Sequence, residues 1–388
     1  MKNCAIICEY NPLHTGHLYQ IDKTRTVLGC DNIIAIMSGS FTQRGIPAIY
    51  DKWKRTEAAL ENGVDMVIEL PAVYAVSTAE RFALGGILTA NAAGIIDSLN
   101  FGSETDNINL LKQTAELLLY EPQAFRNDMK KYLSQGMNHA SARSKAAENQ
   151  IPGAAEVLNG SNAVLAVEYI KALIKTESSI SPTAIKRSGQ GERDFTVSSA
   201  MPSALAIREE LKCGKKPEEL LPESIAKLFK TVSPVFHEDI FGILKYRLLN
   251  IKAEEMEIYS DISEGLENKI IAEIKNAHSM SELITSVKSK RYTYARISRI
   301  LTNILIGITE DISKKACENV PYIRVLGIRK EASALLSELN KYASVPVITN
   351  AKAIKNELLD IDIKASDIRS IFDKTSMGRD YTEKMIII

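Results

Sequence analysis

The sequence predicts an α/β domain with a parallel sheet, followed by a mainly α-helical C-terminal part. Within the first hundred residues, short apolar runs alternate with segments whose apolar residues recur at helical spacing. Apolar strands separated by helices are typical of a parallel sheet that is covered on both faces. Beyond about residue 215, the apolar pattern is mostly that of amphipathic helices.

The individual elements follow from local patterns. Apolar runs predict strands at 4–8, 32–39, 64–71, 96–104 and from 181. Helical spacing predicts helices at 16–28, 51–63, 78–94, 161–175 and 198–212, and a polar, mostly helical insertion at about 107–150. Later patterns predict amphipathic helices at 240–251, 281–307 and 332–343, with a small strand pair at 322–328 and 345–350. We place a domain boundary near 214–222, so that residues 1–215 and 216–388 form two units.

Composition excludes several classes of protein. The 388 residues include 48 basic and 48 acidic side chains, 45% are hydrophobic and 25% are charged. This is an ordinary globular composition, so a polycation, an acidic disordered tail and a low-complexity scaffold are excluded. No stretch approaches about 18 uninterrupted apolar residues, and the first residues do not form a secretory signal, so we expect a cytoplasmic protein with no membrane partner. The five cysteines form no C-x-x-C pair, which predicts neither disulfides nor a thiolate zinc site.

The tetrapeptide His14-Thr15-Gly16-His17 is the most informative motif. It lies in the loop after the first strand and opens the first helix. Two imidazoles at a helix N-terminus, beside a glycine that admits close approach, are typical of a site for phosphate. They would stabilise charge on a phosphoryl group during displacement. The alternative is that both histidines only satisfy loop backbone groups. A zinc site lacks a third ligand, and no P-loop motif occurs.

A strand followed by H-x-G-H at a helix start resembles the HIGH-type nucleotidyltransferase superfamily, whose members attack the α-phosphate of ATP and release pyrophosphate. The later "SALAIR" is similar to a motif that holds the departing phosphates in that superfamily. Ser203, Ile207 and Arg208 match it, whereas Ala204 and Leu205 replace hydroxyl residues. The resemblance implies catalytic roles for His14, His17, Ser203 and Arg208; otherwise, the serine would be only a helix cap and the arginine a surface residue.

A closer resemblance covers nearly the whole chain. Eight blocks occur in the order of the bacterial tRNA(Met) cytidine acetate ligases: "EYNPLHTGHLYQ", "MSGSFTQRGIPAIYDKWKRTEAAL", "GVDMVIELP", "FGSE", "SNAVLAVEYIKAL", "IKRSGQG", "KRYTYARISRIL" and "YIRVLGI". The resemblance implies a Rossmann-like nucleotidyltransferase domain and a helical part that docks tRNA. It also implies acetylation of the wobble cytidine of elongator tRNA(Met), with acetate and ATP as co-substrates and acetyl-adenylate as intermediate, releasing pyrophosphate and AMP.

The same resemblance assigns an ATP site residue by residue. It comprises Ile7, Cys8, Glu9, Tyr10, Asn11, Pro12, Leu13, His14, Thr15, Gly16, His17, Leu18, Tyr19, Gln20, Gly102, Asn162, Arg187 and Ser188. Leu13, Ser40 and Ile46 depart from the family's usual residues. The alternatives are that Gly102 only shapes a turn and that Asn162 only caps its helix. Mg²⁺ is expected with the ATP phosphates, although no set of carboxylates marks protein ligands for a metal.

An acid-free stretch from 283 to 309 suits a polyanion partner. Its basic residues are Lys288, Lys290, Arg291, Arg296 and Arg299. Tyr294, Ile297, Leu301 and Ile304 should form the buried stripe of a helix, which leaves Arg296 and Arg299 on another face for RNA phosphates. The alternative is an ordinary amphipathic helix with a charged solvent face.

The sequence is also compatible with two other functions. A small-molecule nucleotidyltransferase of cofactor biosynthesis would share the histidines and Arg208, but it would not need the helical part after residue 215. A tRNA-binding protein with a vestigial nucleotide site would not need His14, Gly16, His17 and Arg208 intact.

Overall fold

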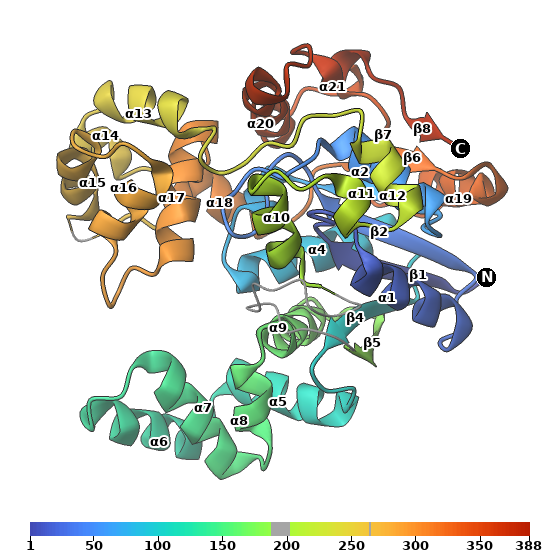
Figure 1. Ribbon diagram of the computed structural model, residues 1–388. Helices are drawn as coiled ribbons and strands as arrows, with labels where there is room; N and C mark the ends of the chain where they lie inside the picture. Colours follow the sequence, from blue (N-terminus) through green and yellow to red (C-terminus); the bar gives the residue numbers. More distant parts are fainter. Residues whose placement is uncertain (188–201, 264) are drawn as a thin grey trace.

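The computed structural model describes residues 1–187, 202–263 and 265–388. One eight-stranded sheet forms its centre (Figure 1), with the order β5-β4-β1-β2-β3-β6-β7 and with β8 also paired to β6. The strands are β1 Asn3–Cys8, β2 Asn32–Ser38, β3 Met66–Leu70, β4 Ser98–Ser103, β5 Ser181–Lys186, β6 Ile323–Ile328, β7 Val347–Ile348 and β8 Ile386–Ile387. All neighbours are parallel except β3 and β6, which confirms the predicted α/β class with a parallel sheet.

Helices connect these strands. The first half contains α1 Thr15–Thr26, α2 Lys52–Glu61, α3 Ala72–Ala75, α4 Ala79–Ala93, α5 Ile108–Tyr120, α6 Gln123–Ser134, α7 His139–Gln150, α8 Ala154–Asn159, α9 Ser161–Lys175 and α10 Ala204–Lys212. The second half contains α11 Pro217–Leu220, α12 Glu223–Phe229, α13 Phe241–Leu249, α14 Ala253–Met256, α15 Leu266–Ile274, α16 Met280–Val287, α17 Tyr294–Ile306, α18 Glu310–Ala316, α19 Ala334–Tyr342, α20 Glu357–Asp373 and α21 Arg379–Thr382. Two 3₁₀ turns, Lys330–Ala332 and Ala351–Ala353, complete the order.

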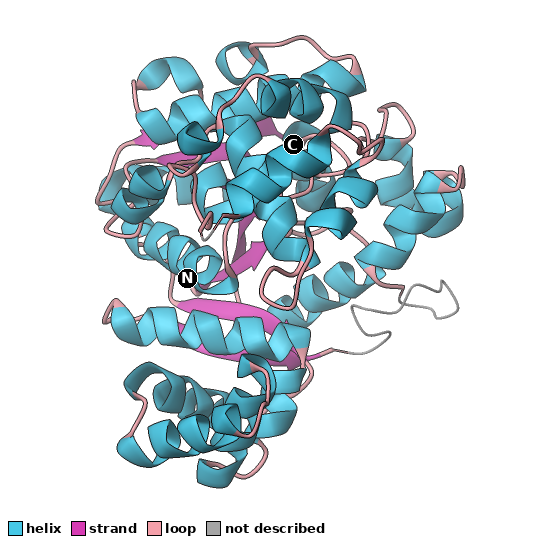
Figure 2. Ribbon diagram, turned by 90° about the vertical axis from the view of Figure 1, so that its left-hand side faces the viewer, coloured by secondary structure: helices cyan, strands magenta, loops and turns pink. Residues whose placement is uncertain are grey.

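Strands β1, β2, β3 and β6 are buried on both faces and β4 nearly so, as the unbroken apolar runs predict, whereas the edge strand β5 is partly exposed. Successive side chains of a strand point to opposite faces. Ala5 and Ile7 of β1 accordingly pack in a core with α4 and α9, whereas Ile6 and Cys8 pack in a second core with α1, α2, α10 and α12. Figure 2 shows helices on both sides of the strands. The carboxyl ends of β1 and β4 are thereby held rigidly at one edge.

The insertion forms a small helical unit with its own core. Helices α5 to α8 gather at the lower end of the molecule in Figures 1 and 2. Leu117, Phe125, Tyr132, Ala146 and Leu158 belong to a hydrophobic cluster that is separate from the two cores of the sheet. The predicted helical character of 107–150 is therefore confirmed.

The sheet crosses the boundary predicted near residue 215. Strand β6 returns from the second half and pairs antiparallel with β3, and β7 and β8 pair with β6. A free edge of β3 would expose unpaired backbone groups, which the returning strand satisfies. The division into 1–215 and 216–388 stays a prediction, but the sheet itself takes strands from both parts.

The predicted single helix at 281–307 is wrong in detail. The structure has α16 and α17, separated by residues 288–293. Thr293 caps α17 by accepting a hydrogen bond from the backbone N–H of Arg296, which starts a new helix at this point. Tyr294 is 40% exposed and is not part of the buried stripe, whereas Ile297, Leu301 and Ile304 are buried as expected.

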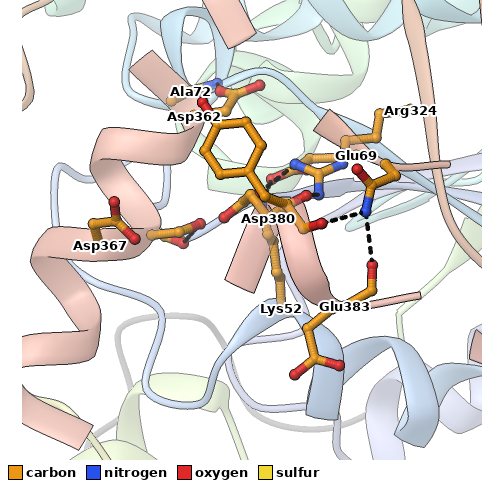
Figure 3. A network of polar contacts seen from close by, with 12 residues as sticks. Lys52, Glu69, Ala72, Arg324, Asp362, Asp367, Asp380 and Glu383 are labelled. Atoms are coloured by element: carbon orange, nitrogen blue, oxygen red, sulfur yellow. Dashed lines mark hydrogen bonds and ion pairs between the residues drawn. The ribbon is translucent and has the colours of Figure 1, made fainter. Parts of the chain in front are cut away.

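A buried ionic network joins both halves of the chain (Figure 3). Lys52 of α2 lies 2.7 Å from Glu69 of β3 and 2.6 Å from Asp380 of α21. Arg324 of β6 lies 3.1 Å from Glu69 and also pairs with Asp380. All four side chains are at most 2% exposed. Buried charges persist only when paired, so the C-terminal segment is tied to the start of α2 and the middle of the sheet.

Asp362 of α20 lies beside this network and makes stability depend on pH. It accepts hydrogen bonds from Ala72 N at 2.6 Å and Tyr322 Oη at 2.7 Å. Burial, and then the charge of Glu69, raise the pKa of Asp362 from 3.8 to about 7. At Asp362, the native state therefore binds more protons than the unfolded state between these values, so the contribution of this residue to the free energy of unfolding should fall as pH rises from about 4 to about 7.

We expect the Asp362→Asn variant to lose this part of the pH dependence. Urea titrations of both proteins at about pH 5 and about pH 8 would measure it. The drop in unfolding free energy between the two pH values should be smaller in the variant, because asparagine cannot ionise. An equal drop in both proteins would show that Asp362 does not titrate in this range.

Candidate active site

A cavity of about 290 Å³ opens at the carboxyl ends of β1 and β4, where ligands bind in open α/β sheets. The N-terminal ends of α1, α9 and α10 also border it. Its wall includes thirteen of the residues predicted for the nucleotide site and catalysis: Ile7, Cys8, Glu9, Tyr10, Asn11, His14, His17, Gln20, Gly102, Asn162, Arg187, Ser203 and Arg208. The structure thus brings together segments that lie up to 200 residues apart in sequence.

Both histidines present the same nitrogen for donation. His14 caps α1, because its Nδ1 accepts a hydrogen bond from Gly16 N at 3.0 Å. The Nδ1 of His17 accepts from His14 N at 3.3 Å. A neutral imidazole that accepts at Nδ1 carries its proton on Nε2, so each ring is left with an Nε2–H donor. The two rings lie 3.9 Å apart between centroids. Each histidine can therefore accept a hydrogen bond from a loop backbone N–H, as the alternative interpretation holds, and at the same time donate one to a ligand.

Electrostatics keep both imidazoles neutral. Burial, followed by the charges of Arg187 and Arg208, lowers the pKa of His14 to about 3. Burial, His14 and Arg187 lower the pKa of His17 well below its ordinary value. Near neutral pH, both rings act as neutral donors, and the fixed positive charge of the site comes from arginines.

The arginines approach from three different segments. Arg208 of α10 donates to Asn11 O at 2.6 Å, which ties α10 to the histidine loop. Arg187, at the end of β5, lies over Gly102; a Cβ on that glycine would come within 3.2 Å of the arginine's Cγ. Arg44, from the loop after β2, lines the same cavity. Such a set of donors suits a polyphosphate.

Ser203 and Asn162 line the cavity, and each also makes a hydrogen bond that stabilises the local structure. Ser203 caps α10 by accepting a hydrogen bond from Ala206 N at 3.1 Å. Asn162 does not cap α9; instead, Glu104 accepts hydrogen bonds from Asn162 Nδ2 at 3.0 Å and from the backbone N–H groups of Asn162 and Ala163. Glu104 thereby positions Asn162, a role that the sequence alone does not reveal, although Glu104 belongs to the "FGSE" block.

A second missed residue is Arg55 of α2, which is fully buried. Its guanidinium donates to the carbonyl oxygens of Glu9 at 2.7 Å, Ser38 at 2.9 Å and Tyr50 at 3.0 Å, and also to that of Gly39. It thereby holds the loop after β1 against the loop after β2. No local sequence signal distinguishes such an arginine from one on a helix surface.

Six further predicted nucleotide contacts, all among the described residues, do not line the cavity. Pro12, Leu13, Thr15, Gly16, Leu18 and Tyr19 are not part of its wall, and Leu13 is fully buried in the core. Ser188 lies outside the described residues. Within the described ranges, no group of three or more His, Cys, Asp or Glu side chains is arranged to hold a metal ion. In the same ranges, no helix is both long and apolar enough to cross a membrane.

The five basic residues of the stretch are not part of the cavity wall, but Arg299 lies close to Arg44, which is. Ser298 and Thr302 of α17 donate to Gly45 O at 3.0 and 2.7 Å. Gly45 has φ +69°, and a Cβ there would lie 2.5 Å from Arg299 N. Arg299 is close enough to Arg44 and Arg296 that, after burial, their charges help to lower its pKa. Lys288, Lys290 and Arg291 lie in or next to the connection between α16 and α17.

Comparisons with known proteins agree with this geometry. The family model of the HIGH nucleotidyl transferases matches residues 1–384. A tRNA(Met) cytidine acetate ligase of Clostridium novyi is 42% identical over 97% of this chain and 96% of its own length. The chain belongs to the tRNA(Met) cytidine acetate ligase family. A ligase of the same name from Clostridium kluyveri is 38% identical over the whole chain and 99% of its own length.

Solved structures of this family have the same fold. Thermotoga maritima TmcAL in its apo form superimposes with a TM-score of 0.92 at 30% identity, over the full length of both chains. The same protein bound with alpha-thio ATP gives a TM-score of 0.90, again at 30% identity over both chains. The full-length match to ligases does not favour the two alternative functions, a cofactor-biosynthesis nucleotidyltransferase or a vestigial tRNA binder.

Proposed function

We propose that this chain is an ATP-dependent ligase that acetylates the wobble cytidine of elongator tRNA(Met). Acetate is activated as acetyl-adenylate with release of pyrophosphate, and AMP leaves when N4-acetylcytidine forms. The observation that carries the proposal is the cavity where His14, His17, Arg187 and Arg208 converge on one anion-binding wall. Two findings on related proteins support the proposal: the relatives are named tRNA(Met) cytidine acetate ligases, and the Thermotoga protein binds an ATP analogue.

In the first step, the neutral imidazoles donate their Nε2–H groups to the α-phosphate as acetate attacks it. Donors aimed at developing charge stabilise a transition state without reorganising. Arg208, held against Asn11 O, and Ser203, at the start of α10, bind the departing pyrophosphate. Gly102 and Arg187 hold the nucleotide at the end of β4 and β5, and Asn162, fixed by Glu104, contributes from α9.

Mg²⁺ belongs to this proposal only as a companion of ATP. Mg²⁺ commonly accompanies nucleotide phosphates and keeps several waters when it is bound to them. Mg²⁺ would neutralise phosphate charge. Because its substrate is a tRNA, we also expect the enzyme to work in the cytoplasm.

The tRNA surface that we propose includes Lys288, Lys290, Arg291, Arg296 and Arg299. Arg296 is stacked 4.7 Å from the ring centroid of Tyr292 and donates to Asp261 O at 3.1 Å, so it is already oriented. Because α17 is docked on Gly45, Arg299 is placed next to Arg44 at the cavity rim. This arrangement would let phosphates near the wobble cytidine contact α17 while the base enters the cavity.

Removing two of these charges should weaken tRNA binding in a salt-dependent way. For the Arg296→Ala, Arg299→Ala double variant, we expect the slope of log K against log salt to become shallower by about 1.4, at about 0.7 per phosphate of single-stranded RNA. Acetate-dependent exchange of pyrophosphate into ATP should persist. The control is the double variant Lys352→Ala, Lys355→Ala, which also loses two positive charges. Both lysines are exposed and follow β7. An unchanged slope in the arginine variant would contradict the proposed surface.

The direct test of function is mass analysis of nucleosides from tRNA(Met) after incubation with the protein, ATP and acetate. We expect N4-acetylcytidine that depends on both ATP and acetate. Pyrophosphate release without an acetylated nucleoside would overturn the second half of the reaction. A nucleotide-containing small product instead would favour a cofactor-type nucleotidyltransferase.

A further inference from the structure

Glu9 is the only carboxylate on the cavity wall among the described residues. It directly follows β1, in the loop that carries the two histidines. Its neighbours on the wall include Arg44, Arg187 and Arg208, so a single negative group stands in a site otherwise suited to anions. A carboxylate in a polyphosphate site repels its ligand, which calls for a role other than binding phosphate.

Contacts with the loop after β2 and with α2 help to fix the position of Glu9. Its Oε1 accepts a hydrogen bond from Gln43 N at 2.7 Å. Its backbone carbonyl accepts from Arg55 Nη1 at 2.7 Å, and Arg55 is fully buried. The carboxylate is therefore held at the rim formed by the loop after β2, the side on which Arg44 and α17 lie. This is the side where we place the tRNA.

The second step of the proposed reaction needs a proton acceptor. The attacking group is the exocyclic amine of a cytidine, whose lone pair is delocalised into the ring, so it attacks well only if a proton is removed as the new bond forms. The histidines are poor candidates: the pKa of each is lowered by burial, and each Nδ1 already accepts a backbone hydrogen bond.

We propose that Glu9 is the general base of acetyl transfer, a role that rests on the proposed function. Its carboxylate takes the proton from the attacking amine. The cytidine N4 forms a bond to the acetyl carbon, and the bond from that carbon to the phosphate oxygen breaks, with its electron pair leaving on AMP. The N4 proton passes to the Glu9 carboxylate and from there to solvent. Glu9 takes no part in the attack of acetate, which carries no proton at neutral pH.

The test uses the Glu9→Gln variant of the full-length protein and measures the two steps separately. Acetate-dependent pyrophosphate exchange reports adenylation. Because Glu9 also stands on the wall of the nucleotide cavity, the decisive quantity is the ratio of the two losses, and we expect transfer to fall far more than exchange. Single-turnover transfer from acetyl-adenylate to tRNA should fall by roughly 10²- to 10⁴-fold, the usual contribution of a general base. The matched control is Glu61→Gln, an exposed glutamate at the end of α2.

A pH profile separates proton transfer from a merely structural role. In the wild type, the transfer rate should fall on the acid side as a carboxylate becomes protonated, and the variant should lack this limb. Glu9→Asp should recover part of the rate with the limb restored.

Three results of these experiments would contradict the proposal. A loss of pyrophosphate exchange in Glu9→Gln as large as the loss of transfer would assign Glu9 to nucleotide or metal binding, and transfer at the wild-type rate would exclude it as a base. A wild-type protein that exchanges pyrophosphate but acetylates no cytidine would overturn the proposed function itself, which distinguishes the two failures.

Discussion

Replacing His17 with alanine is expected to slow adenylation of acetate by roughly 10²- to 10³-fold, the usual cost of removing one donor that stabilises a transition-state charge. The residue supplies an Nε2–H donor because its Nδ1 is occupied by His14 N. The effect should appear in the rate of chemistry more than in ATP affinity, because the donor acts on charge that develops during attack. Acetate-dependent pyrophosphate exchange at varied ATP concentrations measures both quantities.

Glutamine at position 17 provides the matched control. Its amide nitrogen can donate from a position close to that of Nε2, so His17→Gln should retain much more activity than His17→Ala. Because burial, His14 and Arg187 hold the pKa of His17 well below its ordinary value, the wild-type adenylation rate should show no histidine titration around the ordinary pKa of about 6.5. Full adenylation by the alanine variant would remove the histidine from the mechanism.

The Lys52→Met variant is expected to lose about 3–5 kcal/mol of unfolding free energy, the usual cost of breaking a buried ion pair from one side. Methionine fills the space of the lysine stem but leaves Glu69 and Asp380 with Arg324 as their only cationic partner in the network of Figure 3. Urea titration at neutral pH would measure the loss.

Lys54→Met on the same helix is the control for this prediction. Lys54 pairs with Glu57 at 2.7 Å, but both side chains are about 30% exposed, and such pairs contribute only about 0–1 kcal/mol. A loss in Lys52→Met no larger than in Lys54→Met would show that the buried network does not stabilise the fold.

Local patterns in the sequence were enough to predict the first five strands and most of the first-half helices, because burial on two faces and helical periodicity are written in neighbouring residues. They also located His14 and His17 at the start of α1, since a strand, a loop and a helix that follow one another place the motif at a strand's carboxyl end. The helix predicted at 161–175 has the same limits in the structure.

Contacts between distant segments were not predictable in this way. Four such contacts join residues that are 58 to 328 positions apart. They are the pairing of β3 with β6, the ion pair of Lys52 with Asp380, the hydrogen bond from Asn162 to Glu104 and the packing of α17 on Gly45. The sequence also does not predict the break between α16 and α17, because basic and polar residues at 288–293 fit a helix surface as well as a loop.

The sequence by itself determined the class of the sheet, the place of the histidine loop and the family of the chain, since each depends on residues that are close together or occur in a fixed order. Only the tertiary structure decided which nitrogen each histidine presents, that Glu9 alone brings a carboxylate to the described cavity wall, and that Arg299 lies beside Arg44. These features depend on burial and on partners from other segments, which set hydrogen-bond geometry and charge but leave no periodic trace in the chain.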